Sequence, residues 1–240
     1  KHAKEISEDV SDRIYALMGT AVHAVLEKAE NSALTEKRLY AAYDGWVLSG
    51  QFDRMSLSQL TLQDYKLCSV WEGIFGFKFE RVAQLNCLLQ LATDNGFECK
   101  KLEVVAIYRD WMSSRARRGE EGYPKRQVER ISIPVWNEDE RLDYIKTRIR
   151  LHKESRTGGP VAACDDGERW YTGDIYAVKK RGLKRAVKGG LYTNKKSAEN
   201  RVEREGTGHY IEFREGENKR CNDYCAVKSF CKQYGSAKNE

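Results

Sequence analysis

Three ionisable side chains in one short stretch have the types and spacing needed for metal-dependent phosphate chemistry. The stretch Gly50–Lys66 reads GQFDRMSLSQLTLQDYK and contains Asp53, Asp64 and Lys66. Two facing carboxylates repel each other, whereas a divalent ion between them would keep both ionised and use their oxygens as ligands. A neighbouring lysine could stabilise developing negative charge or orient an attacking water. These residue types therefore suit phosphodiester hydrolysis around an oxygen-liganded metal.

A β-hairpin would bring these side chains together. The segments Trp46–Phe52 and Leu60–Leu67 alternate apolar and polar residues with the period of two that is typical of half-buried strands. Asp64 and Lys66 are two residues apart and therefore share one face of the second strand. A turn midway between the two aspartates would set Asp53 opposite Asp64, with Cβ atoms about 4.5–5.5 Å apart. Taken alone, the pattern also suits an ordinary exposed hairpin with surface charges.

The flanking motifs favour the chemical interpretation. The hairpin resembles the core of the PD-(D/E)XK nuclease superfamily, in which an Asp is followed after a gap by D/E-x-K. Within that superfamily, the hairpin resembles the RecB-like branch, which includes the CRISPR-associated RecB-like exonucleases. Gly19–His23 matches the G-x-x-x-H helix of that branch, and Gln84-Leu85 matches the start of its downstream Q-L helix. The resemblance covers residues 11–110.

The resemblance implies a metal-dependent DNA exonuclease that acts on single-stranded ends. His23, Asp53, Asp64 and the carbonyl of Tyr65 would bind Mg²⁺ or Mn²⁺, and the imidazole favours Mn²⁺. Lys66 would position or activate the water and stabilise the transition state, and Gln84 would orient the substrate or the lysine. The usual family motif is Q-L-x-x-Y, and Leu88 stands here at the tyrosine position. An endonuclease with the same site and a non-catalytic DNA-binding or recombination module remain alternatives.

The remaining patterns predict an α/β fold with a restriction-endonuclease-like core, in which helices flank a small mixed sheet. The core would occupy residues 1–157 and a basic α+β module residues 158–240, with a break at Thr157–Pro160. The expected core elements are a helix over Ser11–Glu30 capped by Ser11, a loop over Val70–Phe79, a helix over Lys78–Asn95 closed by Gly96, strands over Leu102–Tyr108 and Glu129–Trp136, and a helix over Glu138–Glu154 capped by Asn137.

The C-terminal module carries most of the excess positive charge. The chain has a net charge of +6, and Lys179–Arg204 holds ten Lys or Arg against two Glu. A hairpin over Asp174–Lys188, a helix over Lys195–Arg204 and a strand over His209–Phe213 are expected to guide DNA, although a solvated basic face would look the same. Trp170, Tyr171 and Tyr192 are available for base stacking or for the core of the module. The candidate phosphate contacts are Lys179, Lys180, Arg181, Lys184, Arg185 and Lys188, together with Arg117 and Arg118 in a second basic stretch.

Four of the seven cysteines suggest a second metal centre. Cys221, Cys225 and Cys231 form a C-x3-C-x5-C group, and Cys164 could complete a set of four thiolates. Both Zn²⁺ and a 4Fe-4S cluster accept four cysteines. One isolated cysteine with a group of three resembles the iron-sulfur centre of RecB-like and AddB-type nucleases. In those relatives the isolated cysteine precedes the first helix, so the fourth ligand is either Cys164 or a residue upstream of Lys1.

The amino-acid composition limits the classes of protein to which this chain can belong. The chain has 40% hydrophobic and 32% charged residues, which is ordinary for a globular protein. No apolar run approaches the about 18 residues of a membrane span, and no signal-peptide pattern opens the chain. We expect a cytoplasmic protein of a prokaryote or of a virus-infected cell that binds DNA and no membrane. The resemblance adds recombination, CRISPR or phage-replication proteins as expected partners.

Overall fold

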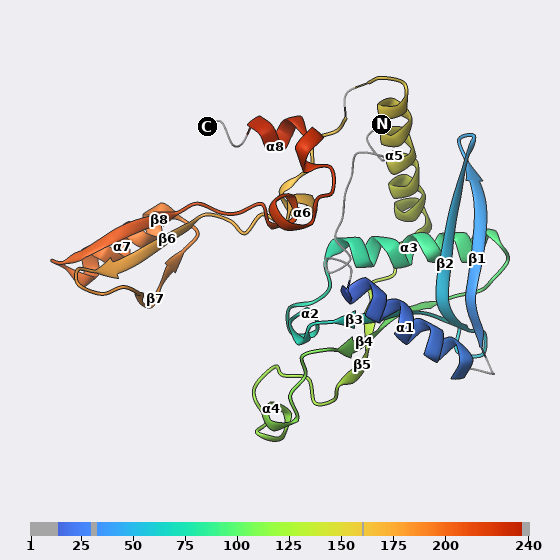
Figure 1. Ribbon diagram of the computed structural model, residues 1–240, viewed down its shortest axis with the longest axis horizontal. Helices are drawn as coiled ribbons and strands as arrows, with labels where there is room; N and C mark the ends of the chain where they lie inside the picture. The colour runs from blue at the N-terminus through green and yellow to red at the C-terminus, as the bar shows by residue number, and fades with distance from the viewer. Residues whose placement is uncertain (1–13, 30–32, 160, 237–240) are drawn as a thin grey trace. The chain divides into compact units, whose positions relative to one another are not determined.

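A computed structural model describes residues 14–29, 33–159 and 161–236 (Figure 1). The described residues fall into two compact units that divide after Ala162. The expected boundary lay slightly earlier in the chain, at residue 157. Among the described residues, no helix is both long and apolar enough to cross a membrane. Each unit is described separately below.

The first unit is built on a mixed five-stranded sheet in the order β1-β2-β3-β4-β5. The pair β3–β4 is parallel and the other three pairs are antiparallel. The expected α/β core with a small mixed sheet flanked by helices is therefore confirmed. The strands are β1 (Leu34–Tyr43), β2 (Trp46–Ser56), β3 (Thr61–Cys68), β4 (Lys101–Tyr108) and β5 (Val128–Ile133).

The edge strand β1 was not predicted. It pairs along its length with β2 through the tight turn Asp44-Gly45, whose two residues have φ values of 49° and 77°. Positive φ at both central positions is the signature of the Asp-Gly hairpin turn. The Asp-Gly pair was thus the sequence signal for this hairpin. The charged residues at the start of β1 obscured that signal.

Five helices accompany the sheet, and α3 crosses between the parallel strands β3 and β4. The prediction for α3 is confirmed, with Gly96 at φ 80° directly after the C-cap Asn95. The prediction for α5 is also confirmed, because Asn137 and Glu140 form a capping box. The expected cap Ser11 lies outside the described residues. The helices are α1 (Ile14–Ala29), α2 (Val70–Phe75), α3 (Phe79–Asp94), α4 (Ser113–Arg117) and α5 (Glu138–Arg156).

The short helix α2 replaces part of the loop that was expected over Val70–Phe79. Ser69 caps it by accepting the Trp71 N–H on its hydroxyl. The carboxylate of Asp110, just beyond β4, accepts the Ser69 hydroxyl at 2.6 Å and the Val70 N–H at 2.8 Å. The loop prediction was wrong because this cap joins residues forty positions apart and could not be seen locally.

The core of the first unit lies between the sheet and α3. Phe52, Met55, Leu62 and Val104 from the central strands are fully buried, as is Leu85 on α3. The buried residues of β4 alternate with the period of two expected for a strand, and those of α3 follow the helical period of about 3.6. They are Leu102, Val104, Ala106 and Tyr108 on β4, and Leu85, Leu88, Leu89 and Ala92 on α3. The packing fixes β2 and β3, the two strands that carry the candidate chemistry.

The second unit contains a three-stranded antiparallel sheet in the order β7-β6-β8. The helix α7 contacts all three strands, and its Ala198 is fully buried. The elements agree with the expected hairpin, helix and strand. They are α6 (Asp166–Arg169), β6 (Ile175–Lys180), β7 (Ala186–Tyr192), α7 (Lys195–Glu205), β8 (His209–Arg214), the short turns η2 (Arg220–Tyr224) and η3 (Lys228–Phe230), and α8 (Lys232–Ser236).

Candidate active site

Three carboxylates form a row across β1, β2 and β3. The β1–β2 register places Glu36 opposite Asp53. The β2–β3 pairing ends at Arg54–Gln63, and the same register continued by one residue sets Asp53 opposite Asp64. This register confirms the expected turn midway between the two aspartates. Because β2 pairs only with β1 beyond this point, β2 and β3 separate where the acidic side chains lie.

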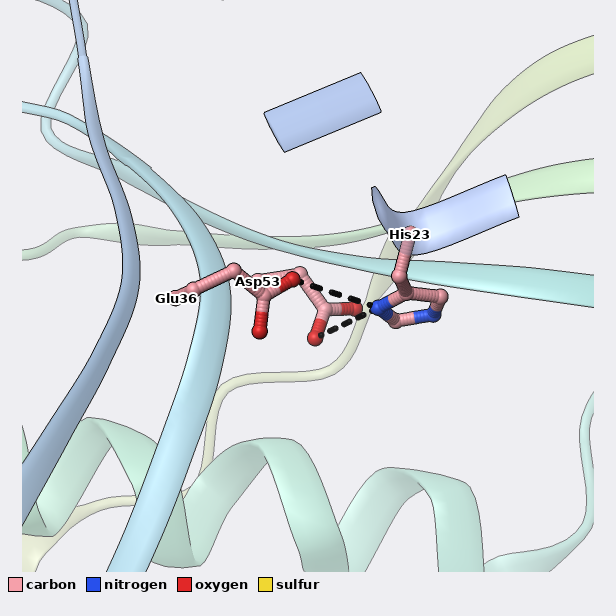
Figure 2. A group of neighbouring side chains, drawn as sticks. All are labelled: His23, Glu36 and Asp53. Carbon is pink, nitrogen blue, oxygen red and sulfur yellow. Dashed lines mark hydrogen bonds and ion pairs between the residues drawn. The ribbon is translucent and has the colours of Figure 1, made fainter. Parts of the chain in front are cut away.

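His23 on α1 closes one side of this row (Figure 2). Its Nδ1 lies 3.3 Å from Glu36 Oε1 and 3.4 Å from Asp53 Oδ1. Its Nε2 lies 3.1 Å from the carbonyl oxygen of Tyr65 on β3. The ligand atoms of His23, Glu36 and Asp53 all lie within 4.8 Å of one another. The G-x-x-x-H helix and the first aspartate of the hairpin therefore meet at one point, an arrangement that the family resemblance implied and the local sequence pattern did not.

The sequence analysis missed Glu36, whose backbone is strained and whose side chain is held by a hydrogen bond. Its backbone adopts φ 47°, a left-handed conformation that costs a non-glycine residue about 1–3 kcal/mol. Gln51 donates through Nε2 to Glu36 Oε2 at 2.6 Å. Such strain is found most often at functional positions, where the surrounding structure maintains it. Finding Glu36 from sequence required β1 and its register with β2.

Asp53 is buried, at 8% exposure, and accepts the Tyr65 N–H on Oδ2 at 2.6 Å. Burial raises the pKa of Asp53 to about 6, and the charge of Asp64 adds to this effect. The Tyr65 N–H and the positive charges of His23 and Lys66 act in the opposite direction. The carboxylate is thus poised to exchange its proton for a cation near neutral pH.

Asp64 and Lys66 form the other half of the site on β3. Lys66 Nζ lies 2.5 Å from Asp64 Oδ2, and the side chains are only 15% and 4% exposed. Asp64 Oδ2 is buried and accepts no hydrogen bond, so Lys66 is its ion-pair partner without being its hydrogen-bond donor. Asp64 lies outside the group formed by His23, Glu36 and Asp53. The structure therefore brings Asp64 to Lys66 rather than into direct contact with the histidine.

The donor set of this site fits a divalent cation. Both nitrogens of His23 face oxygens, yet a neutral imidazole has only one N–H to donate. A metal ion at Nδ1 would suit those contacts, because the single N–H could then sit on Nε2 and donate to the Tyr65 carbonyl. One imidazole nitrogen with several carboxylate and carbonyl oxygens suits Mn²⁺ or Mg²⁺.

The remaining residues singled out in the first unit are Gln84, Leu88, Arg117 and Arg118. Gln84 is exposed on α3, and its predicted role stays untested. Leu88, at the family's tyrosine position, is buried in the core at 5% exposure, where a phenol would need a hydrogen-bond partner. Arg117 and Arg118 are exposed at the end of α4.

The basic residues of the second unit are mostly available to solvent. Lys180, Arg181, Lys184, Arg185 and Lys188 are exposed on and around the β6–β7 turn. The sixth expected contact, Lys179, instead forms an ion pair with Glu212 at 2.8 Å and is 12% exposed. We therefore expect the turn, rather than Lys179, to make any phosphate contacts.

The four expected metal-binding cysteines lie on segments that are held together by other contacts. Gln233, two residues after Cys231, accepts the Cys164 N–H and donates to the Cys164 carbonyl, both at 2.9 Å. Arg220 donates to the carbonyl of Glu168 at 3.1 Å, which joins η2 to α6. All four thiols are free. Burial raises the pKa of Cys221, and the neighbouring Cys225 and Cys231 add to this shift.

If Glu36 is a metal ligand, replacing it with glutamine should weaken Mn²⁺ binding. We expect Glu36→Gln to lower the affinity about 10–100-fold, the range typical of residues that bind a metal or orient its ligands. Isothermal titration of the metal-free protein with Mn²⁺ measures this directly. Glu98→Gln is the matched control, because Glu98 is exposed and pairs with the exposed Lys100. Equal affinities for Glu36→Gln and the control would remove Glu36 from the ligand set.

Comparison with known proteins gives only distant structural likenesses. No protein-family model matches the sequence, and no curated protein is similar to it. A solved structure of a protein called SSO0001 is 17% identical, with a TM-score of 0.41, and the match covers 65% of this chain and 64% of that one. A structure described as a "putative exonuclease" from Eubacterium rectale is 12% identical, with a TM-score of 0.39 and coverages of 72% and 62%. The chain thus spans less than two thirds of either protein.

Proposed function

We propose that the first unit is a divalent-metal-dependent DNA nuclease that hydrolyses phosphodiester bonds, and that it acts as an exonuclease on single-stranded ends. The observation that carries this proposal is the row of Glu36, Asp53 and Asp64, flanked by His23 and Lys66. Few other reactions need several carboxylates, an imidazole and a lysine around one point between two diverging strands. The motif resemblance to RecB-like nucleases supplies the DNA substrate and the preference for ends.

The residues divide into two chemical roles. His23 Nδ1, Glu36 and Asp53 would hold Mn²⁺ or Mg²⁺, with Asp64 as a further ligand. The Tyr65 carbonyl, which the resemblance suggested as a ligand, lies against the opposite nitrogen Nε2 and would instead orient the imidazole. A bound divalent ion lowers the pKa of its water and neutralises charge on the transition state. If a bound metal ion took the Asp64 carboxylate as a ligand, the Lys66 ammonium group could donate to the attacking water or to a phosphate oxygen. Gln84 remains our candidate for orienting the strand.

The test is cleavage of end-labelled linear single-stranded DNA with Mn²⁺, Mg²⁺ or chelator. Wild-type protein should degrade the DNA only with metal, and Asp64→Asn should be inactive under all three conditions. Lys100→Gln serves as a surface control, since Lys100 is exposed and pairs with Glu98. Degradation in chelator, or by Asp64→Asn at the wild-type rate, would refute the proposed site.

Circular single-stranded DNA separates the alternatives. An exonuclease leaves the circle intact, whereas an endonuclease of the same fold cuts it. A non-catalytic binding module would shift both circle and linear strand in a gel without cutting either. The identity of the label that is lost first from a linear strand gives the polarity.

We further propose that Cys164, Cys221, Cys225 and Cys231 bind one metal centre in the second unit, either a 4Fe-4S cluster or Zn²⁺. The support is the double hydrogen bond from Gln233 to Cys164, which ties the isolated cysteine to the segment after Cys231. Cys221, Cys225 and Cys231 are free, half-buried thiols, and the thiol of Cys164 is free and exposed. The basic β6–β7 turn lies in the chain between these cysteines and would serve as the DNA-guiding surface.

Metal analysis and colour distinguish the two centres. An iron-sulfur cluster gives a brown protein with iron and sulfide, whereas zinc leaves it colourless. Cys164→Ser should lose most of the metal if Cys164 is the fourth ligand. The matched control is Cys99→Ser, because Cys99 lies in the first unit and donates to the carbonyl of Lys101. Full metal content in Cys164→Ser would point instead to a ligand upstream of Lys1.

A further inference from the structure

An exposed aromatic pair lies on α2, which directly follows β3, the strand that carries Asp64 and Lys66. Trp71 and Phe75 are one helical turn apart, with ring planes at 11° and centroids 5.7 Å apart. They are 49% and 80% exposed. The helix is anchored to the core through Val70, which is 2% exposed, so its two largest side chains are left to solvent. We refer to Trp71 and Phe75 as the aromatic platform.

The platform is held rigidly. The Asp110 carboxylate binds the start of α2 through Ser69 and Val70, as described above. On the other side, Gly73 lies against Tyr108, where an added Cβ would fall 2.7 Å from the ring carbon that bears the hydroxyl. Tyr108 itself is fully buried. The helix is therefore seated closely on the sheet, which lowers the entropic cost of binding a ligand on its outer face.

The platform also lies beyond the carboxyl ends of the parallel strands β3 and β4, where open α/β sheets bind their ligands. Helix α1 (Figure 1) connects the site to this region. His23 lies in the site, and Tyr15 lies eight residues earlier on the same helix, about 12 Å away at the α-helical rise. The Tyr15 ring packs under the guanidinium of Arg109, with 4.6 Å between Cζ and the ring centroid. Arg109 directly precedes Asp110, the residue that caps α2.

Arginines accompany the exposed rings. Arg115 on α4 lies 5.8 Å from the centroid of the Trp71 ring and pairs with Glu120. Arg117 and Arg118 follow it and are exposed. Flat aromatic faces beside guanidinium groups are the combination that binds single-stranded nucleic acid, because bases stack on the rings and phosphates pair with the arginines. A paired base presents its faces to its neighbours in the duplex and cannot use such a platform.

We propose that Trp71 and Phe75 stack on unpaired bases of the strand whose phosphodiester occupies the candidate active site, so that the platform selects single-stranded over duplex nucleic acid. This inference rests on the proposed nuclease function and adds the feature of the substrate that the site recognises. Arg109, Arg115, Arg117 and Arg118 would contact the phosphates on either side of the stacked bases. An exposed apolar pair could alternatively receive a protein, which the experiment below distinguishes.

The test measures binding of the full chain to labelled oligonucleotides in chelator, so that no cleavage is required. Three probes of equal length are compared by fluorescence anisotropy: single-stranded DNA, the same strand with abasic sites, and blunt duplex. Wild type should prefer the strand with bases. Trp71→Leu and Phe75→Leu should each weaken that binding about five-fold or more, as expected for loss of one stacking contact. Binding to the abasic strand should change less than about two-fold, since stacking needs a base.

Two further variants guard the interpretation. Trp71→Phe keeps a ring and should restore most of the affinity that Trp71→Leu loses. Tyr40→Leu removes a comparable aromatic side chain, 57% exposed on β1, and should leave binding unchanged. Circular dichroism confirms that each variant is folded. Equal losses on base-containing and abasic strands would overturn the stacking role, and unchanged affinity in both leucine variants would leave the patch to a protein partner.

The outcome is separable from that of the proposed function. If the leucine variants weaken binding as expected but wild type cleaves no DNA with metal, the platform stands and the nuclease proposal fails. If wild type cleaves DNA but the leucine variants bind the base-containing strand normally, the platform proposal fails and the nuclease stands.

Discussion

Replacing Lys66 with methionine should lower the rate of phosphodiester cleavage about 10²–10³-fold or more, the loss typical when one group that stabilises a developing oxyanion is removed. Methionine keeps an unbranched chain of similar length and removes only the charge. Lys66 Nζ lies 2.5 Å from Oδ2 of the buried Asp64 carboxylate. If a bound metal ion took that carboxylate as a ligand, the ammonium group could act on the phosphate or its attacking water. The loss should therefore appear in kcat rather than in KM.

Metal binding separates this catalytic role from a structural one. A lysine that only neutralised Asp64 would act by keeping the carboxylate folded in place, so its removal would weaken Mn²⁺ binding or the fold. A lysine that acts in the transition state should leave Mn²⁺ affinity unchanged or raise it, because a competing positive charge has gone. Lys101→Met is the matched control, since Lys101 is exposed at the start of β4. Retained activity in Lys66→Met would exclude lysine catalysis at this site.

The hairpin at the centre of the site could be predicted because its information is local. Alternation along β2 and β3 and the spacing of Asp53 and Asp64 were enough to place the two carboxylates opposite each other. The histidine helix was also local, but its meeting with Asp53 followed only from the family resemblance. In each case the pattern of a few adjacent residues determines which side chains share a face.

Glu36 and the platform helix could not be predicted because they depend on tertiary contacts. Glu36 faces the site only through the pairing of β1 with β2, and its φ of 47° is opposed by its own backbone preference. The helix α2 exists because Asp110, beyond β4, caps it across the parallel strands. The Gln233 contact to Cys164 is of the same kind, joining residues 69 positions apart. Local propensity is overruled at these points, as is usual at functional positions.

Replacing Asp53 with asparagine should have opposite effects on stability and on metal binding. Its pKa in the folded protein is raised from 3.8 to about 6, mainly by burial and then by Asp64. When the pKa of a carboxyl is higher in the folded than in the unfolded protein, its ionisation lowers the free energy of unfolding. This loss of stability is absent at pH values below the unfolded pKa and is complete at pH values above the folded pKa. Metal-free wild type should therefore gain about 1.4 kcal/mol of stability from this group as pH falls from 7.5 to 5, and the gain should approach about 3 kcal/mol only below pH 4.

Asp53→Asn removes that cost without changing the shape of the side chain. Its amide oxygen can still accept the Tyr65 N–H that Asp53 Oδ2 accepts. We therefore expect metal-free Asp53→Asn to unfold at a higher temperature than wild type at pH 7.5, with the difference vanishing near pH 4. Asp110→Asn is a control for which we expect the opposite change in stability. There, hydrogen bonds from Ser69 and Val70 outweigh the effect of burial and lower the pKa of Asp110, so its neutralisation should destabilise the protein.

Added Mn²⁺ should reverse the order of the two proteins. Wild type should gain about 2.7 kcal/mol when the free ion is at one hundred times its dissociation constant, and Asp53→Asn should gain little. The Mn²⁺ affinity of wild type should also fall as pH drops below about 6, because the ion must then displace the proton on Asp53. Thermal unfolding at pH 7.5 and 5.5, with and without Mn²⁺, tests all three expectations. A wild-type protein that Mn²⁺ stabilises no more than Asp53→Asn would show that the raised pKa of Asp53 reflects a buried structural acid and that the row of carboxylates holds no metal.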